Sequence, residues 1–280
     1  SGWKPSGGEK RKRSSRKKTM QTEKVTDYIV DWLSAYCGQA GVDGFAVGIS
    51  GGIDSAVTSA LCAKTGKTVY ALLMSIRTPA DQLTLARRHG DWLKARFSNV
   101  FVLQQDLTPV FEAVEASFPG DLQDGLTMAN TRSRLRMVAL YAYATHHRLL
   151  VAGTGNKVED FGVGFFTKYG DGGVDISPIA DLMKSEVYAV GRHLGIIDDI
   201  LEAPPTDGLW ADNRSDADQI GATYDELEWA MRFDENKAAA EDLGERQEEV
   251  LALYRRLNRA NRHKMDPIPV AEIPGELKGN

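Results

Sequence analysis

Cysteine is nearly absent from this sequence, whose 280 residues include only Cys37 and Cys62. Neither belongs to a CxxC pair, and no histidine lies near either of them along the chain. Two cysteines could form one disulfide, but isolated cysteines are more typical of buried thiols in a reducing compartment. We therefore expect free thiols and a cytoplasmic protein.

Long apolar runs are also missing. No stretch approaches the ~18 residues that a membrane helix needs, and we find no pattern of a charged head, an apolar stretch and a cleavage site that would mark a signal peptide. Hydrophobic residues make up 42% and charged residues 26% of the chain, which is ordinary for a globular protein. The length suits one large α/β domain followed by helices, and we expect no membrane contact.

Positive charge is scarce outside the N-terminal segment. Residues 1–20 contain eight Lys or Arg and one acid, whereas the rest of the chain contains 26 Lys or Arg against 38 Asp or Glu. An acidic body argues against nucleic-acid binding. The basic segment 1–20 has two interpretations, a nucleic-acid or nuclear-targeting arm and a disordered leader before a natural start at Met20. We favour the leader and expect residues 21–280 to form a single domain.

Buried apolar runs and helical periodicities alternate through the first part of the chain. The strands are expected at Gly44–Ile49, Val69–Met74, Val100–Gln104 and Leu149–Ala152. The helices are expected at Gln21–Ala40, Ser55–Lys64, Asp81–Phe97, Thr108–Ser117 and Met128–His146. This alternation predicts an α/β fold, with a doubly wound, mainly parallel sheet flanked by helices.

The pattern changes after Gly153. The segment Asp160–Asp175 lacks periodicity, and Glu202–Arg214 is expected to be a loop. Further helices are expected at Lys184–Leu194, Tyr224–Phe233 and Glu245–Asn261, and the tail Pro267–Asn280 shows no clear pattern.

A glycine-rich turn follows the first expected strand. It consists of Gly48, Ile49, Ser50, Gly51, Gly52, Ile53, Asp54 and Ser55. Adjacent glycines let the backbone approach a ligand closely, and the free N–H groups of a helix start attract anions such as phosphates. The alternative is an ordinary tight turn in which Asp54 or Ser55 caps the helix. Asp54 would repel a bare polyphosphate, so its presence favours a divalent cation between the two.

Two common nucleotide-binding loops are excluded for this turn. A Walker A loop requires a lysine after its last glycine, and no lysine follows Gly52. The dinucleotide fingerprint GxGxxG is also absent, because Gly153-Thr154-Gly155 lacks the third glycine.

The turn SGGIDS resembles the pyrophosphate-releasing ATP loop of the adenine-nucleotide α-hydrolase superfamily. Motifs farther along resemble one member of it, the NAD synthetase family, in the same order and at similar spacing. These motifs are GTGNKVE (153–159), GFFTKYGDGGVD (164–175), LMK (182–184), PTDGLW (205–210) and HK (263–264). Glutamine-dependent members carry a large amidase domain, for which the roughly twenty residues before Gln21 leave no room. The resemblance therefore implies free ammonia as the nitrogen donor.

The resemblance also implies a two-step ligase reaction with ATP as co-substrate. The carboxylate of deamido-NAD attacks ATP and pyrophosphate leaves, after which ammonia displaces AMP from the NAD-adenylate to give NAD. A carboxylate must approach a polyphosphate, so positioning and charge neutralisation should dominate catalysis. The implied roles are ATP binding by the glycine-rich turn with Thr154, Lys184 and Thr206, Mg²⁺ ligation by Asp54 and Glu159, and deamido-NAD binding by Arg134, Lys168, Asp175, His263 and Lys264.

Alternatives stay open for the residues and for the function. Arg134 lies between Arg132 and Arg136, so a solvated basic helix face is nearly as good an interpretation, and His263 could cap a helix. The chain could instead be another ATP-pyrophosphatase ligase acting on GMP-type or tRNA substrates, although its acidic body argues against tRNA. A non-catalytic nucleotide-binding module is the third hypothesis.

Two further expectations concern assembly and motion. The resemblance implies a homodimer in which the helix Met128–His146 takes part, with no nucleic-acid partner. The segment Gly162–Gly173 contains five glycines around Phe165, Phe166 and Tyr169. We expect this segment to be a lid that orders over the substrates and excludes water from the adenylate.

Overall fold

The computed structural model describes residues 20–203, 219–236 and 243–278. The basic segment before Met20 and the loop that contains Thr206 therefore lie outside the described residues. Two expectations fall there, the disordered leader and the ATP contact of Thr206.

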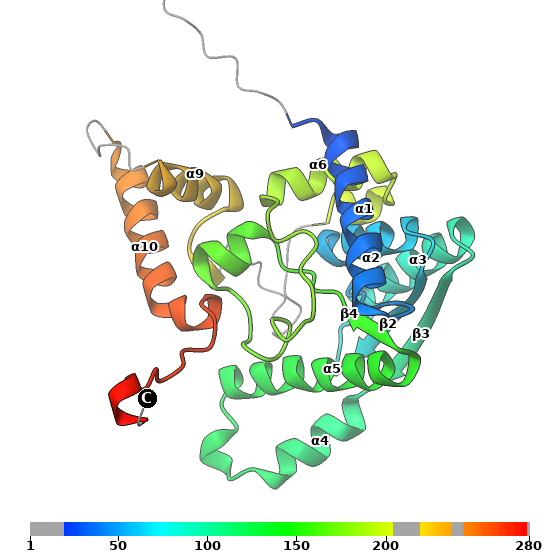
Figure 1. Ribbon diagram of the computed structural model, residues 1–280, viewed down its shortest axis with the longest axis horizontal. Coiled ribbons are helices and arrows are strands. Elements are labelled where there is room, and N and C mark those ends of the chain that lie inside the picture. Colours follow the sequence, from blue (N-terminus) through cyan, green and yellow to red (C-terminus); the bar gives the residue numbers. More distant parts are fainter. Residues whose placement is uncertain (1–19, 204–218, 237–242, 279–280) are drawn as a thin grey trace, which may run out of the picture.

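A parallel sheet of four strands forms the centre of the described fold (Figure 1). The strands are β1 (Gly44–Gly48), β2 (Thr68–Ser75), β3 (Val100–Asp106) and β4 (Leu149–Val151), and their order is β3-β2-β1-β4. Every neighbouring pair is parallel. Because β1 lies between β2 and β4, the chain winds outward in both directions from β1, and the predicted doubly wound sheet is confirmed.

Helices cover both faces of the sheet, as the alternation of side chains along a strand requires. On one face, Phe45 and Val47 of β1 pack with α1 (Thr22–Ala40), α2 (Ile53–Lys64), α3 (Ala80–Arg96) and α6 (Lys184–Leu194). On the other face, Ala46 packs against α5 (Gly125–His147). Helix α4 (Thr108–Ser117) lies against α5 rather than against the sheet (Figure 1).

The C-terminal part forms a second, smaller core. A π-helix (Val158–Val163) packs with α9 (Tyr224–Glu235) and α10 (Glu245–Met265). Figure 1 shows α9 and α10 side by side, away from the sheet. Within the described residues, the remaining helices and turns are α7 (Asp198–Leu201) and short 3₁₀ turns at Gly120–Leu122 and Gly275–Leu277.

Two expectations about regular structure need correction. The segment Asp160–Asp175 was expected to be irregular, but it begins inside the π-helix. Helix α10 continues to Met265 instead of stopping at Asn261. Asn258, Asn261 and Lys264 explain the longer helix, because they donate hydrogen bonds to backbone carbonyls of residues 161–166.

Both cysteines are free and buried, Cys37 in α1 and Cys62 in α2, as expected. Burial raises the pKa of both thiols. No helix in the described part of the chain is long and apolar enough to cross a membrane.

Candidate active site

The glycine-rich turn connects β1 to α2 and is shaped by glycine and serine. Gly51 has a φ of +89°, and a Cβ there would lie 3.0 Å from both the Gln82 carbonyl oxygen and the Leu85 Cβ. The turn therefore requires glycine at this position, both for its backbone conformation and for its approach to α3. The Ser55 hydroxyl accepts a hydrogen bond from the Ser50 N–H and donates one to the Gly52 carbonyl.

Asp54, in the first turn of α2, does not cap that helix. Its Oδ2 accepts a hydrogen bond from Lys184 Nζ at 2.5 Å, and its Oδ1 accepts one from Asn156 Nδ2 at 3.2 Å. The interpretation of the turn as an ordinary Asp-capped helix start is therefore wrong for Asp54, although the Ser55 hydroxyl does stabilise the turn.

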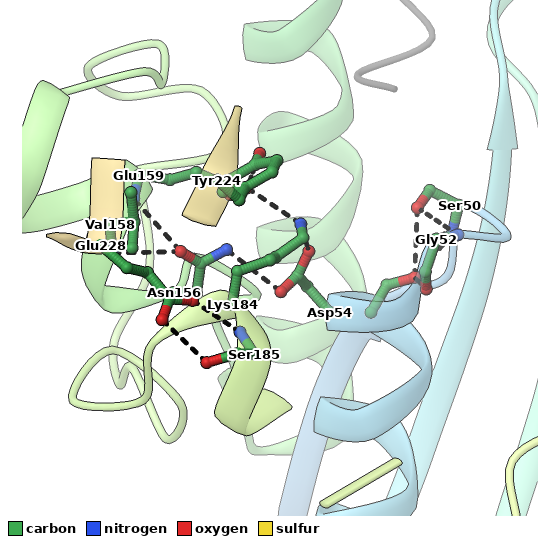
Figure 2. A network of polar contacts seen from close by, with 11 residues as sticks. Ser50, Gly52, Asp54, Asn156, Val158, Glu159, Lys184, Ser185, Tyr224 and Glu228 are labelled. Atoms are coloured by element: carbon green, nitrogen blue, oxygen red, sulfur yellow. Dashed lines mark hydrogen bonds and ion pairs between the residues drawn. The ribbon is translucent and has the colours of Figure 1, made fainter. Parts of the chain in front are cut away.

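A lysine and two carboxylates form the centre of the site (Figure 2). Lys184 Nζ also donates to Glu159 Oε1 at 3.0 Å, so one ammonium group joins Asp54 and Glu159. The side chain of Lys184 is 5% exposed, and each carboxylate side chain is 16% exposed. The Tyr224 hydroxyl donates a further hydrogen bond to Glu159 Oε1. Asp54 is thus brought to Lys184, which follows it by 130 residues, and to Glu159.

Asn156 connects the charged centre to the backbone of the π-helix. It is fully buried, and while its amide nitrogen contacts Asp54, its Oδ1 accepts the N–H groups of Val158 and Glu159 at 3.1 and 3.2 Å. This one side chain therefore fixes Glu159 relative to Asp54. The sequence contained the signal, since Asn156 is the asparagine of GTGNK, but no role was expected for it.

Acidic side chains outnumber basic ones around Lys184. Burial lowers the pKa of Lys184, but Asp54 and Glu159 more than offset this, so that its pKa lies above the ordinary value and the ammonium stays charged. Burial and the neighbouring carboxylates of Glu159, Asp171 and Asp54 raise the pKa of Asp160 well above its usual value. The site therefore favours added positive charge.

A cavity of about 310 Å³ opens at the carboxyl ends of the strands. All eight residues of the glycine-rich turn line it, together with Thr154, Glu159 and Lys184. In parallel sheets, ligands bind at this edge near the point where the strand order reverses. Apart from Thr206, every residue expected to contact ATP or its metal ion therefore lines this one cavity.

The cavity also contains residues that were not expected. Leu73, Met74 and Ser75 at the end of β2 line it, and so does Arg136, whose Nε donates to the Met74 carbonyl at 3.0 Å. Of the three arginines on α5, Arg136 thus lies on the wall, whereas Arg134 does not line this cavity. The helical spacing of the arginines was visible in the sequence, but the face turned toward the sheet was not.

Four of the five residues expected to bind deamido-NAD form one group beside the cavity. Arg134 donates to the Lys168 carbonyl at 3.3 Å, and Lys168 Nζ donates to the His263 carbonyl at 2.5 Å. Lys264 Nζ donates to the carbonyls of Gly164 and Phe166, both at 2.9 Å. The His263 ring contacts the Ala260 carbonyl within its own helix.

Asp175 contacts a different set of residues from the other four. Its Oδ1 accepts from the Tyr141 hydroxyl at 2.9 Å, and its Oδ2 accepts from the Val151 N–H at 2.8 Å. In this structure, Asp175 therefore connects the end of β4 to α5.

The glycines of segment Gly162–Gly173 allow close packing. A Cβ on Gly164 would lie 2.4 Å from the Asn261 Cβ, and one on Gly170 would lie 2.3 Å from the Ser133 hydroxyl. Asp171 Oδ1 accepts from Ser133 at 2.6 Å and from the Thr167 N–H at 2.9 Å, which ties the segment to α5. Closure of this segment over a ligand stays a prediction.

In the described part of the chain, no group of three or more His, Cys, Asp or Glu side chains is placed to hold a metal ion. Asp54 and Glu159 are the acidic pair at the glycine-rich turn. A cation held there would need further ligands from a bound phosphate.

A glycine-rich turn at the carboxyl edge of a parallel sheet, followed by a helix start and a lysine between two carboxylates, defines an α/β nucleotide-binding protein. The family model described as NAD synthase matches residues 25–267. The chain therefore belongs to the NAD synthase family and is an enzyme of that family with ATP as co-substrate, which confirms the resemblance seen in its motifs.

Similar proteins match this chain over most of their own length. The NH(3)-dependent NAD(+) synthetase of Methanosarcina acetivorans is 38% identical over 91% of this chain and all of its own. The enzyme of the same name from Sulfolobus acidocaldarius is 36% identical over 80% of each chain. Among solved structures, NMN synthetase from Francisella tularensis has a TM-score of 0.79 and 30% identity, covering 91% of this chain and all of that one.

Proposed function

We propose that this enzyme converts deamido-NAD to NAD with ATP and free ammonia, through an NAD-adenylate, releasing AMP and pyrophosphate. The observation that carries the proposal is the arrangement of Asp54, Lys184 and Glu159 beside the glycine-rich turn, in one cavity. The names of the Methanosarcina and Sulfolobus relatives support ammonia as the nitrogen donor.

The chemistry needs activation because a carboxylate is a poor electrophile. An oxygen of the deamido-NAD carboxylate forms a bond to the α-phosphorus of ATP, and the bond from that phosphorus to pyrophosphate breaks. Ammonia then adds to the carbonyl carbon, loses a proton, and AMP leaves with the bonding electron pair. The N–H groups of the turn and the ammonium of Lys184 stabilise negative charge on the phosphates.

The donor set fits Mg²⁺. Lys184 already places a positive charge between Asp54 and Glu159, and two carboxylates with phosphate oxygens form a usual Mg²⁺ environment. When bound, Mg²⁺ would neutralise charge on the ATP phosphates. We propose Asp54 and Glu159 as its protein ligands, Thr154 and Thr206 as further ATP contacts, and Lys184 as a group that turns from the carboxylates to the phosphates.

The second substrate carries its own pyrophosphate, which suits a basic surface. We propose that Arg134, Lys168, His263 and Lys264 bind deamido-NAD. The contacts of Arg134 with Lys168 and of Lys168 with His263 support this, and Lys264 contacts the carbonyls of Gly164 and Phe166 in the same segment. We also propose that Asp175 binds deamido-NAD in the same site. We further propose a homodimer, because α5 exposes Leu126 and Val138, and a cytoplasmic location, which the buried free thiols support.

A coupled assay tests the proposal. Incubation with ATP, Mg²⁺, deamido-NAD and ammonium should yield NAD, AMP and pyrophosphate in equal amounts, and ADP with phosphate would contradict it. Asp54→Asn should lower kcat by roughly a hundredfold or more, because it removes a charge that holds the cation at the phosphates. Asp43→Asn, in the turn before β1, should leave kcat unchanged.

A second substrate belongs in the same assay. The Francisella neighbour is called NMN synthetase, so nicotinic acid mononucleotide should be compared with deamido-NAD. A higher kcat/KM for the mononucleotide would assign the enzyme to that substrate, while leaving the adenylation chemistry in place.

A further inference from the structure

The charged centre is supported by two separate cores. Asp54 is the second residue of α2, whose apolar face belongs to the core beneath the sheet. Val158 and Met183, the residues just before Glu159 and Lys184, belong instead to the second core with α9 and α10. The position of Glu159 therefore depends on how the pair α9–α10 packs. Lys184 stands between the two cores, because α6, which it begins, also places Val187 and Val190 in the core beneath the sheet.

Tyr224, the first residue of α9, contacts both of these groups with one side chain (Figure 2). Its hydroxyl donates to Glu159 Oε1, and Lys184 Nζ lies 4.5 Å from the centre of its ring. A cation at this distance from an aromatic ring is attracted to the ring face. The same side chain thus holds the carboxylate by a hydrogen bond and the ammonium by its ring.

The start of α9 is itself held firmly, so that Tyr224 has a fixed place. Thr223 caps the helix together with Glu226 in a reciprocal capping box. Arg246 of α10 donates to both Glu226 carboxylate oxygens, at 2.8 and 3.0 Å. The backbone of Tyr224 is therefore tied to α10 on one side, while its side chain faces the charged centre on the other.

The two hydrogen bonds to Glu159 share one oxygen. Lys184 and Tyr224 both donate to Oε1. If Lys184 turns toward a phosphate, the Tyr224 hydroxyl still holds Oε1. The carboxylate then keeps its orientation at the moment when its positive partner leaves.

We propose that Tyr224 is a positioning residue of the ATP site. Its hydroxyl keeps Glu159 directed at the cation that accompanies ATP, and its ring keeps the Lys184 ammonium beside both carboxylates. This inference rests on the proposed function, because it takes Glu159 as a ligand of that cation.

Two substitutions separate the hydroxyl from the ring, and calorimetric titration of ATP at a series of Mg²⁺ concentrations measures both effects. Tyr224→Phe should raise the Mg²⁺ concentration for half-maximal ATP binding on the order of tenfold, with metal-free ATP affinity unchanged within about twofold. Tyr224→Leu should in addition strengthen metal-free ATP binding, by roughly threefold to tenfold, because the ring no longer holds Lys184 beside the carboxylates and the ammonium turns more easily to the phosphates.

Tyr254→Phe is the matched control. Tyr254 is a buried tyrosine of α10 in the same core, so its substitution removes a hydroxyl there without touching Glu159. We expect no change in Mg²⁺ dependence. In a Glu159→Gln background, Tyr224→Phe should have no further effect, because the two residues act through one contact. This cycle remains informative even if Tyr224→Phe lowers stability.

The outcomes separate this inference from the proposed function. Equal Mg²⁺ dependence for Tyr224→Phe and Tyr254→Phe would overturn the role of Tyr224, even if the enzyme makes NAD. A shifted Mg²⁺ dependence in a protein that makes no NAD would support Tyr224 and reject the substrate. Failure of the unmodified protein to bind ATP at any Mg²⁺ concentration would reject both.

Discussion

Gly51 and Gly52, the adjacent glycines of the glycine-rich turn, are required for different reasons. Gly51 combines a positive φ with close contacts to α3, whereas Gly52 has an ordinary φ of −89° and a Cβ there would meet only the Ser50 hydroxyl, at 3.4 Å. Glycine is therefore required at position 51 for folding of the turn. At position 52 it keeps a side chain away from the approaching ligand.

We predict that Gly51→Ala mainly lowers stability, whereas Gly52→Ala mainly weakens ATP binding. Gly51→Ala should lower the free energy of unfolding by about 1–3 kcal/mol, because of the strained φ and the contacts with α3. Gly52→Ala should leave stability within about 0.5 kcal/mol but weaken ATP binding. Urea unfolding and ATP titration of both variants measure this, and equal stability losses would contradict the assignment.

His89 gives the folded protein a dependence on pH that is unrelated to the active site. It is 1% exposed, and its Nε2 lies 2.8 Å from the Ser59 hydroxyl, with Trp92 stacked against its ring. Burial lowers the pKa of His89 to about 4. The unfolded chain, in which histidine titrates near 6.5, therefore binds a proton first as the pH falls.

This difference predicts that stability is complete above about pH 6.5 and is lost as the pH falls toward 4. Between pH 7 and pH 5 the loss from His89 should be about 2 kcal/mol. His89→Gln cannot titrate, so it should flatten the profile in urea unfolding experiments. His146→Gln, on an exposed histidine, is the control, and an unchanged slope for His89→Gln would show that His89 is not the cause.

Helix α9 supports the active site at a second point, one turn beyond Tyr224. Glu228 is buried, and its carboxylate accepts the Ser185 N–H at 2.7 Å and the Ser185 hydroxyl at 2.8 Å. Ser185 follows Lys184 at the start of α6. The N-terminal end of α6, with its positive dipole end, is thus anchored by a carboxylate from a distant helix.

We predict that Glu228→Leu lowers the free energy of unfolding by about 1–2 kcal/mol, because the Ser185 N–H and hydroxyl both lose their acceptor. ATP affinity should fall as well, since Lys184 is adjacent. Arg232→Ala removes the half-exposed partner of Glu228 and should cost less than about 1 kcal/mol. Equal losses for the two variants would show that Ser185 is not the partner that matters.

The elements that could be predicted from sequence alone are those whose own residues carry a recognisable pattern. The four strands are short apolar runs, and each was placed within two residues of its observed ends. Helix α5 begins at Gly125 rather than Met128 because Asp124 accepts the N–H groups of Leu126 and Thr127. That cap was present in the sequence, but the first turn carries too few periodic residues to reveal it.

The missed features depend on distant residues. The π-helix is stabilised by the adjacent Asn156 and also by the asparagines of α10, which lie nearly a hundred residues away in the sequence. Tyr224 lies 65 residues from Glu159. The carboxylates and Lys184 could be proposed because each stands in a recognisable motif, whereas Tyr224 and Glu228 acquire their roles only through packing.

At the scale of the whole molecule, helix α5 exposes apolar side chains to solvent. Leu126 is 62% exposed and Val138 57% exposed, and the helix packs on the sheet with its other side. Exposed apolar side chains on a helix that contributes residues beside the site suit an interface between two copies of the chain.

We predict that the protein is a dimer and that Val138→Asp produces monomers, because a buried charge without a partner disfavours association. Size-exclusion chromatography with light scattering measures the mass. Tyr28→Asp, on an exposed position of α1 that lies across the sheet, should leave the mass unchanged. A monomeric unmodified protein, or equal behaviour of both variants, would contradict an interface at α5.

The division into two cores has a consequence for heat tolerance. Local opening needs less free energy in a small helical unit than in a sheet packed on both sides. Warming should therefore separate Glu159 from Asp54 and Lys184 while the strands remain paired, because α6 packs with α2 in the core beneath the sheet. Turnover should stop several degrees before the cooperative melting transition, and cooling from that range should restore it immediately, because nothing but the helical pair has to close again.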